Sequence, residues 1–135
     1  MQIFGSDIDP NALALARTHA FEAGVEGVVH FQKLPVAEVR SRFKYGHMIA
    51  NPPYGERLGD VKAVEGLYLE LGETFNRLEN WSLHMLTTHQ SPERLIGRRW
   101  DKSRKLYNGR LECHYYQFFG QRPPREPYQN SIEKR

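Results

Sequence analysis

Short apolar runs alternate with helical patterns along this sequence, and the alternation limits its fold more than any other feature. Strand-like runs occupy residues 2–7, 28–31, 45–50 and 83–88. An apolar stripe at helical spacing precedes the last run, and its members are Val64, Leu67, Tyr68, Leu71, Phe75 and Leu78. Strands alternating with helices predict an α/β domain with a mainly parallel sheet.

Two further helices are expected from their start signals. Residues 9–24 begin with an aspartate that caps the helix and with Pro10 at the first helical position, where its missing N–H costs nothing. Residues 91–100 begin with a similar Ser-Pro-Glu sequence.

The folded part is expected to end in a β-hairpin. Asn108-Gly109 is typical of a two-residue turn, and the strand after it runs to Phe119. We therefore predict a domain over residues 1–120, followed by a mostly disordered basic and Pro-rich tail over residues 121–135.

Composition excludes several classes of protein. The net charge of +3 permits a polyanionic partner without requiring one. The single cysteine excludes an internal disulfide, and the six histidines lack the spacing of a metal site. No apolar run approaches the ~20 residues that span a bilayer. We expect a cytoplasmic protein without a membrane partner or a bound metal.

Asn51-Pro52-Pro53-Tyr54 directly follows the apolar strand that ends at Ala50. An amino group on a planar ring is a poor nucleophile, because its lone pair is delocalised. The Asn51 side-chain oxygen and the Pro52 carbonyl can accept its hydrogens and align it for methyl transfer. The prolines fix the backbone in advance, and Tyr54 offers a face for stacking. No general base is required, since the proton can leave after transfer.

The same tetrapeptide also fits a rigid turn or a polyproline segment that binds a partner. Its position after a strand favours the methyl-transfer site, because ligands bind beyond the carboxyl ends of parallel strands.

A second site candidate follows the first strand. Asp7 at a strand end is suited to bind both hydroxyls of a ribose, and Ile8 is suited to pack on adenine. Asp9 fits the helix cap better. The alternative is that both aspartates only cap the helix.

Three segments resemble a bacterial family, the 23S rRNA guanine-N2 methyltransferases, whose members are also described as N6-adenine-specific DNA methylases. These segments are residues 5–10, 51–59 and 105–109, and the resemblance extends from residue 2 to about residue 125. The segment 51–59 is the specific one, whereas the first segment alone is not.

The resemblance implies a class I, Rossmann-like methyltransferase fold with S-adenosylmethionine (SAM) as the donor. The acceptor it implies is a guanine amino group in ribosomal RNA. It assigns Asn51, Pro52, Pro53 and Tyr54 to the catalytic site at the target amine, and Asp7 to the ribose of the donor. We expect Ile8 and Asn51 to bind the donor as well. Tyr54 and Arg57, which follow the strand, are the expected substrate-binding residues.

The family carries a Gly-rich loop and a strand ahead of its acid strand, and this sequence shows neither before Gln2. We therefore expect a partial fold in which the strands 2–7 and 45–50 each keep an unpaired apolar edge, which favours self-association. We also expect the chain to be inactive alone. Residues 32–36 lack the acid that many methyltransferases use to contact adenine.

The residues leave three alternatives open. The basic segment 94–110, with Trp100 and Tyr107 interleaved, suits either RNA binding or a solvated surface. DNA adenine and protein glutamine present the same kind of NH2 group to the same motif. A non-catalytic RNA-binding remnant is the third alternative.

Overall fold

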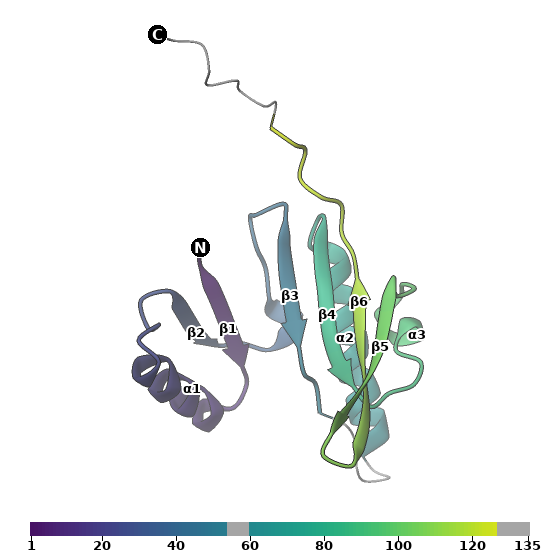
Figure 1. Cartoon of the computed structure of the whole chain (residues 1–135), viewed down its shortest axis with the longest axis horizontal. Coiled ribbons are helices and arrows are strands. Elements are labelled where there is room, and N and C mark those ends of the chain that lie inside the picture. The colour runs from purple at the N-terminus through teal and green to yellow at the C-terminus, as the bar shows by residue number, and fades with distance from the viewer. Residues whose placement is uncertain (54–59, 127–135) are drawn as a thin grey trace.

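The computed structural model describes residues 1–53 and 60–126, which form two β-sheets with flanking helices (Figure 1). The elements in chain order are β1 (Ile3–Asp7), α1 (Pro10–Glu22), β2 (Val29–Lys33), the 3₁₀ helix η1 (Val36–Glu38), β3 (Gly46–Ala50), α2 (Asp60–Arg77), β4 (Trp81–Thr87), α3 (Glu93–Ile96), β5 (Lys102–Asn108) and β6 (Leu111–Phe118).

The first sheet is a β1–α1–β2 unit. β1 and β2 pair in parallel, with Ile3 opposite Val29 and Asp7 opposite Lys33. The predicted start of α1 is confirmed, because the Asp9 side chain accepts a hydrogen bond from the Asn11 N–H at 2.9 Å and Pro10 is the first helical residue.

The second sheet has the strand order β3-β4-β6-β5. β3 and β4 are parallel, whereas β6 runs antiparallel to both β4 and β5. The predicted α/β class with a terminal antiparallel hairpin is confirmed. The expectation of a mainly parallel sheet is wrong for this sheet, because the hairpin turns the chain back and inserts β6 between β4 and β5.

Helix α2 supplies much of the core. It lies behind the four-stranded sheet in Figure 1, and Val64, Tyr68, Leu71 and Phe75 of the predicted apolar stripe belong to its buried face. The main core cluster is Val64, Tyr68, Leu71, Phe75, Leu83, Met85, Ile96, Tyr116 and Phe118. Burial of each large apolar side chain contributes about 1.5–3 kcal/mol. α2 also fixes η1, since the Thr74 hydroxyl donates to the Val36 carbonyl at 2.9 Å and Arg77 donates to the Ala37 carbonyl at 2.8 Å.

Two expectations about local structure need correction. The helix predicted over residues 91–100 is only α3, because Gly97 adopts a left-handed φ of 79° and its N–H bonds back to the Glu93 carbonyl. The hairpin turn is displaced by one residue. Asn108 pairs with Leu111, so the turn residues are Gly109 and Arg110, and Gly109 has a φ of 64°.

β1 and β3 each pair with one strand among the described residues, β2 and β4 respectively. Apolar side chains remain exposed on both strands, including Phe4 at 68 % and Ile49 at 84 %. Residues 121–126 form neither helix nor strand, and residues 127–135 lie outside the described part of the chain. The disordered tail therefore stays a prediction.

The side of the four-stranded sheet away from α2 carries a polar cluster of His47, His84, Tyr115 and Gln117. The Gln117 amide donates to Nδ1 of His84 at 3.2 Å, so neutral His84 carries its proton on Nε2. Nε2 lies 3.1 Å from Nδ1 of His47 and donates to it. Partial burial, and then the charge of His47, lower the pKa of His84.

Two glycines in α2 give a matched test of helix packing. A Cβ on Gly72 would lie 2.6 Å from both the backbone Cα and the carbonyl oxygen of Ile96, whereas a Cβ on Gly66 meets nothing within 4 Å. We predict that Gly72→Ala lowers the free energy of unfolding by about 1–3 kcal/mol because α3 must move. Gly66→Ala should raise it by up to about 1 kcal/mol. Urea denaturation measures both, and equal effects of the two substitutions would contradict this packing.

The histidine cluster predicts a pH dependence of stability. Because the folded pKa of His84 is lowered, the unfolded chain binds more protons as the pH falls below about 6.5. The contribution of His84 to the free energy of unfolding is complete above that pH and is lost below it. We expect His84→Gln to flatten this part of a pH series of urea midpoints, and His19→Gln, on the exposed surface of α1, to leave it unchanged. An unaltered profile in His84→Gln would refute the assignment.

Candidate active site

The arrowheads of β1, β3 and β4 in Figure 1 point to the same side of the molecule. The ends of these strands therefore bring Asp7, Asn51 and the 88–91 loop to one edge. Ligands of α/β proteins bind beyond the carboxyl ends of parallel strands, so this edge is the candidate site.

Asp7 ends β1 with its side chain exposed. Its Oδ1 accepts the Asp9 N–H at 2.8 Å, whereas Asp9 alone caps α1. The alternative in which both aspartates cap the helix is therefore not the arrangement observed. One hydrogen bond leaves a carboxylate with further acceptor capacity. Ile8, the next residue, is 65 % exposed and offers an apolar surface beside it.

The Asn51-Pro52-Pro53 segment follows β3 directly. The pairing of β3 with β4, in which Ala50 lies opposite Met85, fixes where this segment begins. Pro52 is buried, while Asn51 and Pro53 are exposed. The chain is therefore anchored at the middle residue of the segment, and the fixed φ angles of both prolines restrict its backbone. Tyr54 and Arg57 lie outside the described residues.

The 88–91 loop was not singled out by the sequence. The hydroxyls of Tyr68 and Thr87 are hydrogen-bonded to each other, and Thr87 accepts the His89 N–H at 3.0 Å. Nδ1 of His89 accepts the Ser91 N–H at 3.1 Å. Its Nε2 therefore carries the proton of the neutral ring, and it lies 3.9 Å from a carboxylate oxygen of Glu65. No spacing in the sequence could reveal this arrangement, because the partners come from α2 and from the end of β4.

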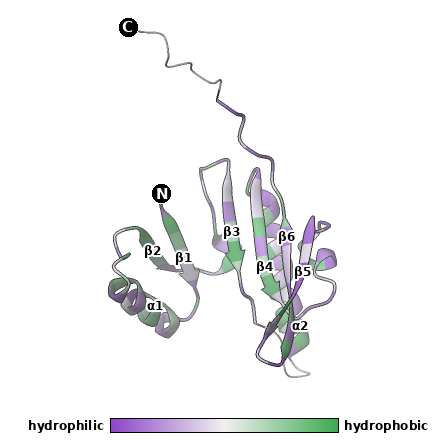
Figure 2. Ribbon diagram, viewed as in Figure 1, coloured by the Kyte–Doolittle hydropathy of each residue, from purple (hydrophilic) through white to green (hydrophobic). Residues whose placement is uncertain are grey.

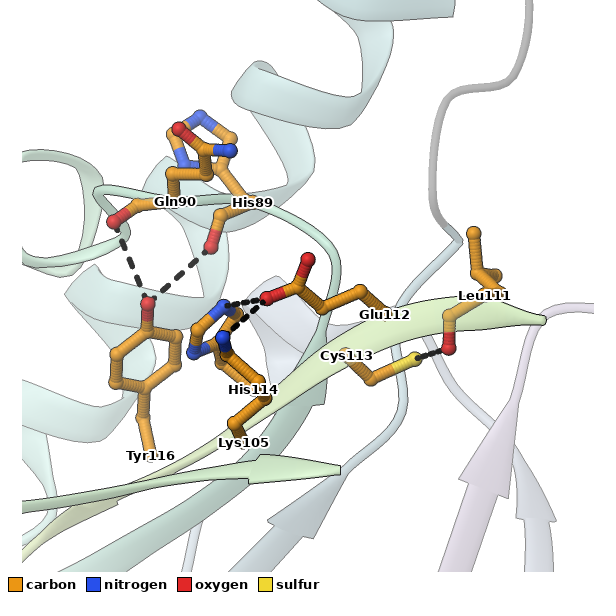
Figure 3. A network of polar contacts seen from close by, with 8 residues as sticks. All are labelled: His89, Gln90, Lys105, Leu111, Glu112, Cys113, His114 and Tyr116. Atoms are coloured by element: carbon orange, nitrogen blue, oxygen red, sulfur yellow. Dashed lines mark hydrogen bonds and ion pairs between the residues drawn. The ribbon is translucent and has the colours of Figure 1, made fainter. Parts of the chain in front are cut away.

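Tyr116 of β6 also contacts this loop (Figure 3). Its hydroxyl lies 3.3 Å from the Gln90 carbonyl and 3.5 Å from the His89 carbonyl, and it donates to them. Burial, and then the charge of Glu93, raise the pKa of Tyr116, so the hydroxyl keeps the proton that it donates. The loop at this edge is therefore contacted from three elements, α2, β4 and β6.

A hollow of about 280 Å³ lies at the opposite edge, where β3 and β4 begin. Tyr45, His47, Ser82 and Phe119 are among its lining residues. It contains neither Asp7 nor Asn51, so we place the site at the carboxyl edge on the chemistry of its residues. Among the described residues, no three His, Cys, Asp or Glu side chains are grouped to hold a metal ion, and no helix is long and apolar enough to cross a membrane.

A family model described as an RMKL-like methyltransferase domain matches residues 1–117. The match covers most of the chain, including β1, β3 and the segment at the candidate site. The chain belongs to the RMKL-like methyltransferase domain family. The resemblance inferred from residues 5–10, 51–59 and 105–109 is thereby confirmed at the level of the family.

Two curated relatives of this RMKL-like domain come from bacteria. The chain is 40 % identical over 132 residues to the Bacillus subtilis (strain 168) protein named "Putative RNA methyltransferase YpsC". This alignment covers 97 % of the chain and 34 % of the relative. It is 40 % identical over 117 residues to ribosomal RNA large subunit methyltransferase K/L of Legionella pneumophila (strain Corby), covering 86 % of the chain and 16 % of the relative. The chain thus spans about a third of the first relative and less of the second.

A solved structure supports the fold of the RMKL-like domain. SMU.472, crystallised in complex with SAH, matches with a TM-score of 0.84 and 46 % identity, over 90 % of this chain and 32 % of that one. The expected α/β methyltransferase fold is confirmed by this match.

Proposed function

We propose that the carboxyl edge of β1 and β3 transfers a methyl group from SAM to the exocyclic amino group of a base in RNA. The specific acceptor that we propose is guanine N2 in 23S rRNA. The observation that carries the proposal is the Asn51-Pro52-Pro53 segment, anchored by buried Pro52 at the same edge as Asp7.

Asn51 and Pro52 supply the acceptors for the amino group. The side-chain oxygen of Asn51 and the main-chain carbonyl of Pro52 each accept one hydrogen of the NH2 group. Two acceptors draw the nitrogen toward tetrahedral geometry, which restores a lone pair for attack. Because the prolines fix the backbone before substrate arrives, little ordering remains to be done on binding.

Asp7 and Ile8 fit the donor. The exposed Asp7 carboxylate keeps acceptor capacity for ribose hydroxyls, and Ile8 presents an apolar side chain for adenine. Bound SAM supplies a methyl group on a positively charged sulfur, which keeps the bonding electrons when the methyl leaves. A relative of 46 % identity crystallised with SAH supports this choice of donor.

An RNA acceptor is supported by the two curated relatives, whose names specify RNA and large-subunit ribosomal RNA. The guanine amino group is proposed from the match of residues 51–59 to the guanine-N2 family. DNA adenine and protein glutamine are the competing acceptors, and both can be supplied in the same assay.

We predict that Asn51→Ala lowers methyl transfer by on the order of 100-fold, a loss comparable to that of one preorganised hydrogen-bonding group in other active sites. The measurement uses a chimera in which this chain replaces the matched segment of the Legionella enzyme, with labelled SAM and ribosomal RNA. Asn11→Ala, at an exposed position in the first turn of α1, is the matched control.

Mass spectrometry of the RNA product should locate the methyl group on guanine N2. Turnover by Asn51→Ala equal to that of the Asn11→Ala control would remove Asn51 from the reaction. If adenine-containing DNA or a glutamine peptide is labelled more than RNA, the acceptor is DNA or protein instead of RNA.

We further propose that the 135-residue chain by itself binds SAM weakly. Asp7 and Asn51 lie on strands of two sheets that do not hydrogen-bond to each other, so nothing in the described pairing fixes their separation. Calorimetric titration of the chain should show no saturation at micromolar SAM, while the chimera saturates. Micromolar affinity of the folded chain, with its fold checked by circular dichroism, would contradict this expectation.

A further inference from the structure

The β5–β6 hairpin extends past the candidate site. His114 of β6 lies opposite Thr87, the last residue of β4, and opposite Lys105 of β5. The residues between Lys105 and His114 therefore continue beyond the end of β4. We call residues 105–114 the hairpin arm, which begins and ends at the Lys105–His114 pair. With about 3.3 Å per strand residue, the arm reaches on the order of 10 Å past that edge, and Figure 1 shows its turn on the side to which the β3 and β4 arrowheads point.

The structure divides the basic segment 94–110 into two parts. The Arg98 guanidinium lies 5.0 Å from the Phe75 ring centroid and donates to the Phe119 carbonyl, and Trp100 packs 6.0 Å from Tyr116. These two side chains stabilise the fold. In contrast, every residue of β5 is exposed, and the strand is mostly hydrophilic in Figure 2.

Tyr107 and Arg110 are the exposed binding groups of the arm. Tyr107 is 66 % exposed, which leaves a large part of its ring available for stacking. Arg110, in the turn, is exposed and has no carboxylate within ion-pair distance in the described ranges 1–53 and 60–126.

The acidic group of the arm is already neutralised. Glu112 lies 3.2 Å from the Lys105 ammonium and 3.7 Å from the His114 ring (Figure 3). The hydrogen bond and the charge of Glu112 raise the pKa of Lys105, which keeps the Lys105 ammonium charged. The uncompensated charge at the tip of the arm is therefore positive.

The arm's register places Tyr107 on the same face of the hairpin as a residue that contacts the 88–91 loop. Tyr107 lies opposite Glu112, and Lys105 opposite His114, so these four side chains share one face of the hairpin. Tyr116 belongs to the same face and bonds to the 88–91 loop. Tyr107 therefore lies past the end of β4, on the hairpin face that contacts the 88–91 loop of the candidate site.

We propose that the hairpin arm binds unpaired RNA next to the methylated base, with Tyr107 stacking on a base and Arg110 contacting a phosphate. Aromatic stacking with a neighbouring cation is the usual chemistry of single-stranded nucleic-acid binding, and duplex bases offer no free face to stack on. The choice of RNA as the occupant rests on the proposed function.

The test measures binding of the full 135-residue chain to a short fluorescent single-stranded RNA by anisotropy. Tyr107→Ala should raise the Kd by about 5- to 150-fold, in line with the loss of one stacked base. Tyr107→Phe should keep the wild-type affinity. Arg110→Gln should weaken binding and reduce the slope of log Kd against log salt by about 1.

Tyr45→Ala and Arg99→Gln are the matched controls, because both residues are exposed and both precede their strands at the opposite edge. The melting temperature of each variant should stay close to that of the wild type, since the substituted side chains are exposed. The proposal is overturned if the wild-type chain does not bind single-stranded RNA, or if it binds duplex RNA more tightly. An equal loss in the control variants also overturns it.

Methyl transfer by the chimera separates this proposal from the proposed function. If the chimera methylates RNA and the Tyr107→Ala and Arg110→Gln variants keep their RNA affinity, RNA binding by the arm is refuted and the proposed function stands. If those variants lose RNA affinity and the chimera transfers no methyl group, RNA binding by the arm is supported and the proposed function is contradicted.

Discussion

The burial of Pro52 directly after β3 is the constraint on which the candidate site depends. A buried residue with a fixed φ angle determines where the backbone leaves the sheet. Asn51 before it and Pro53 after it are exposed, so the same anchor presents a side-chain amide and a restricted backbone at the edge. The parallel pairing of β3 with β4 then sets this segment beside the 88–91 loop.

The rest of the domain fixes that edge from behind. α2 packs its apolar face on the sheet and also holds η1 and the end of β4. Tyr116 of β6 holds the 88–91 loop through two main-chain carbonyls. Side chains far apart in the sequence are thereby combined into one border at the carboxyl edge of β3 and β4, where Asn51 follows β3.

Much of this fold was predictable because its signals are local. The stripe from Val64 to Leu78 specifies a helix and its buried face, and the Asp9-Pro10 pair specifies where α1 begins. The specific motif at residues 51–59 was sufficient to indicate the family that the comparison then confirmed. The site roles of Asp7, Ile8, Asn51, Pro52 and Pro53 remain predictions, and those of Tyr54 and Arg57 concern residues outside the described part.

The features that sequence reasoning missed depend on contacts between distant segments. The predicted long helix after Ser91 ends at Ile96, since Gly97 adopts a left-handed conformation. His89 gains its partners only after α2 and β4 pack together. Composition could not show which side chains of the basic segment pack on the fold and which are exposed for binding. Arg98 and Trp100 pack on Phe75 and Tyr116, which belong to other elements.

The most direct test of the central claim is a crystal structure of the chimera with SAH and a guanine-containing oligonucleotide. We predict that the guanine N2 atom lies about 2.6–3.2 Å from both the Asn51 side-chain oxygen and the Pro52 carbonyl oxygen. A guanine bound elsewhere, with these two oxygens turned toward other protein groups, would contradict it.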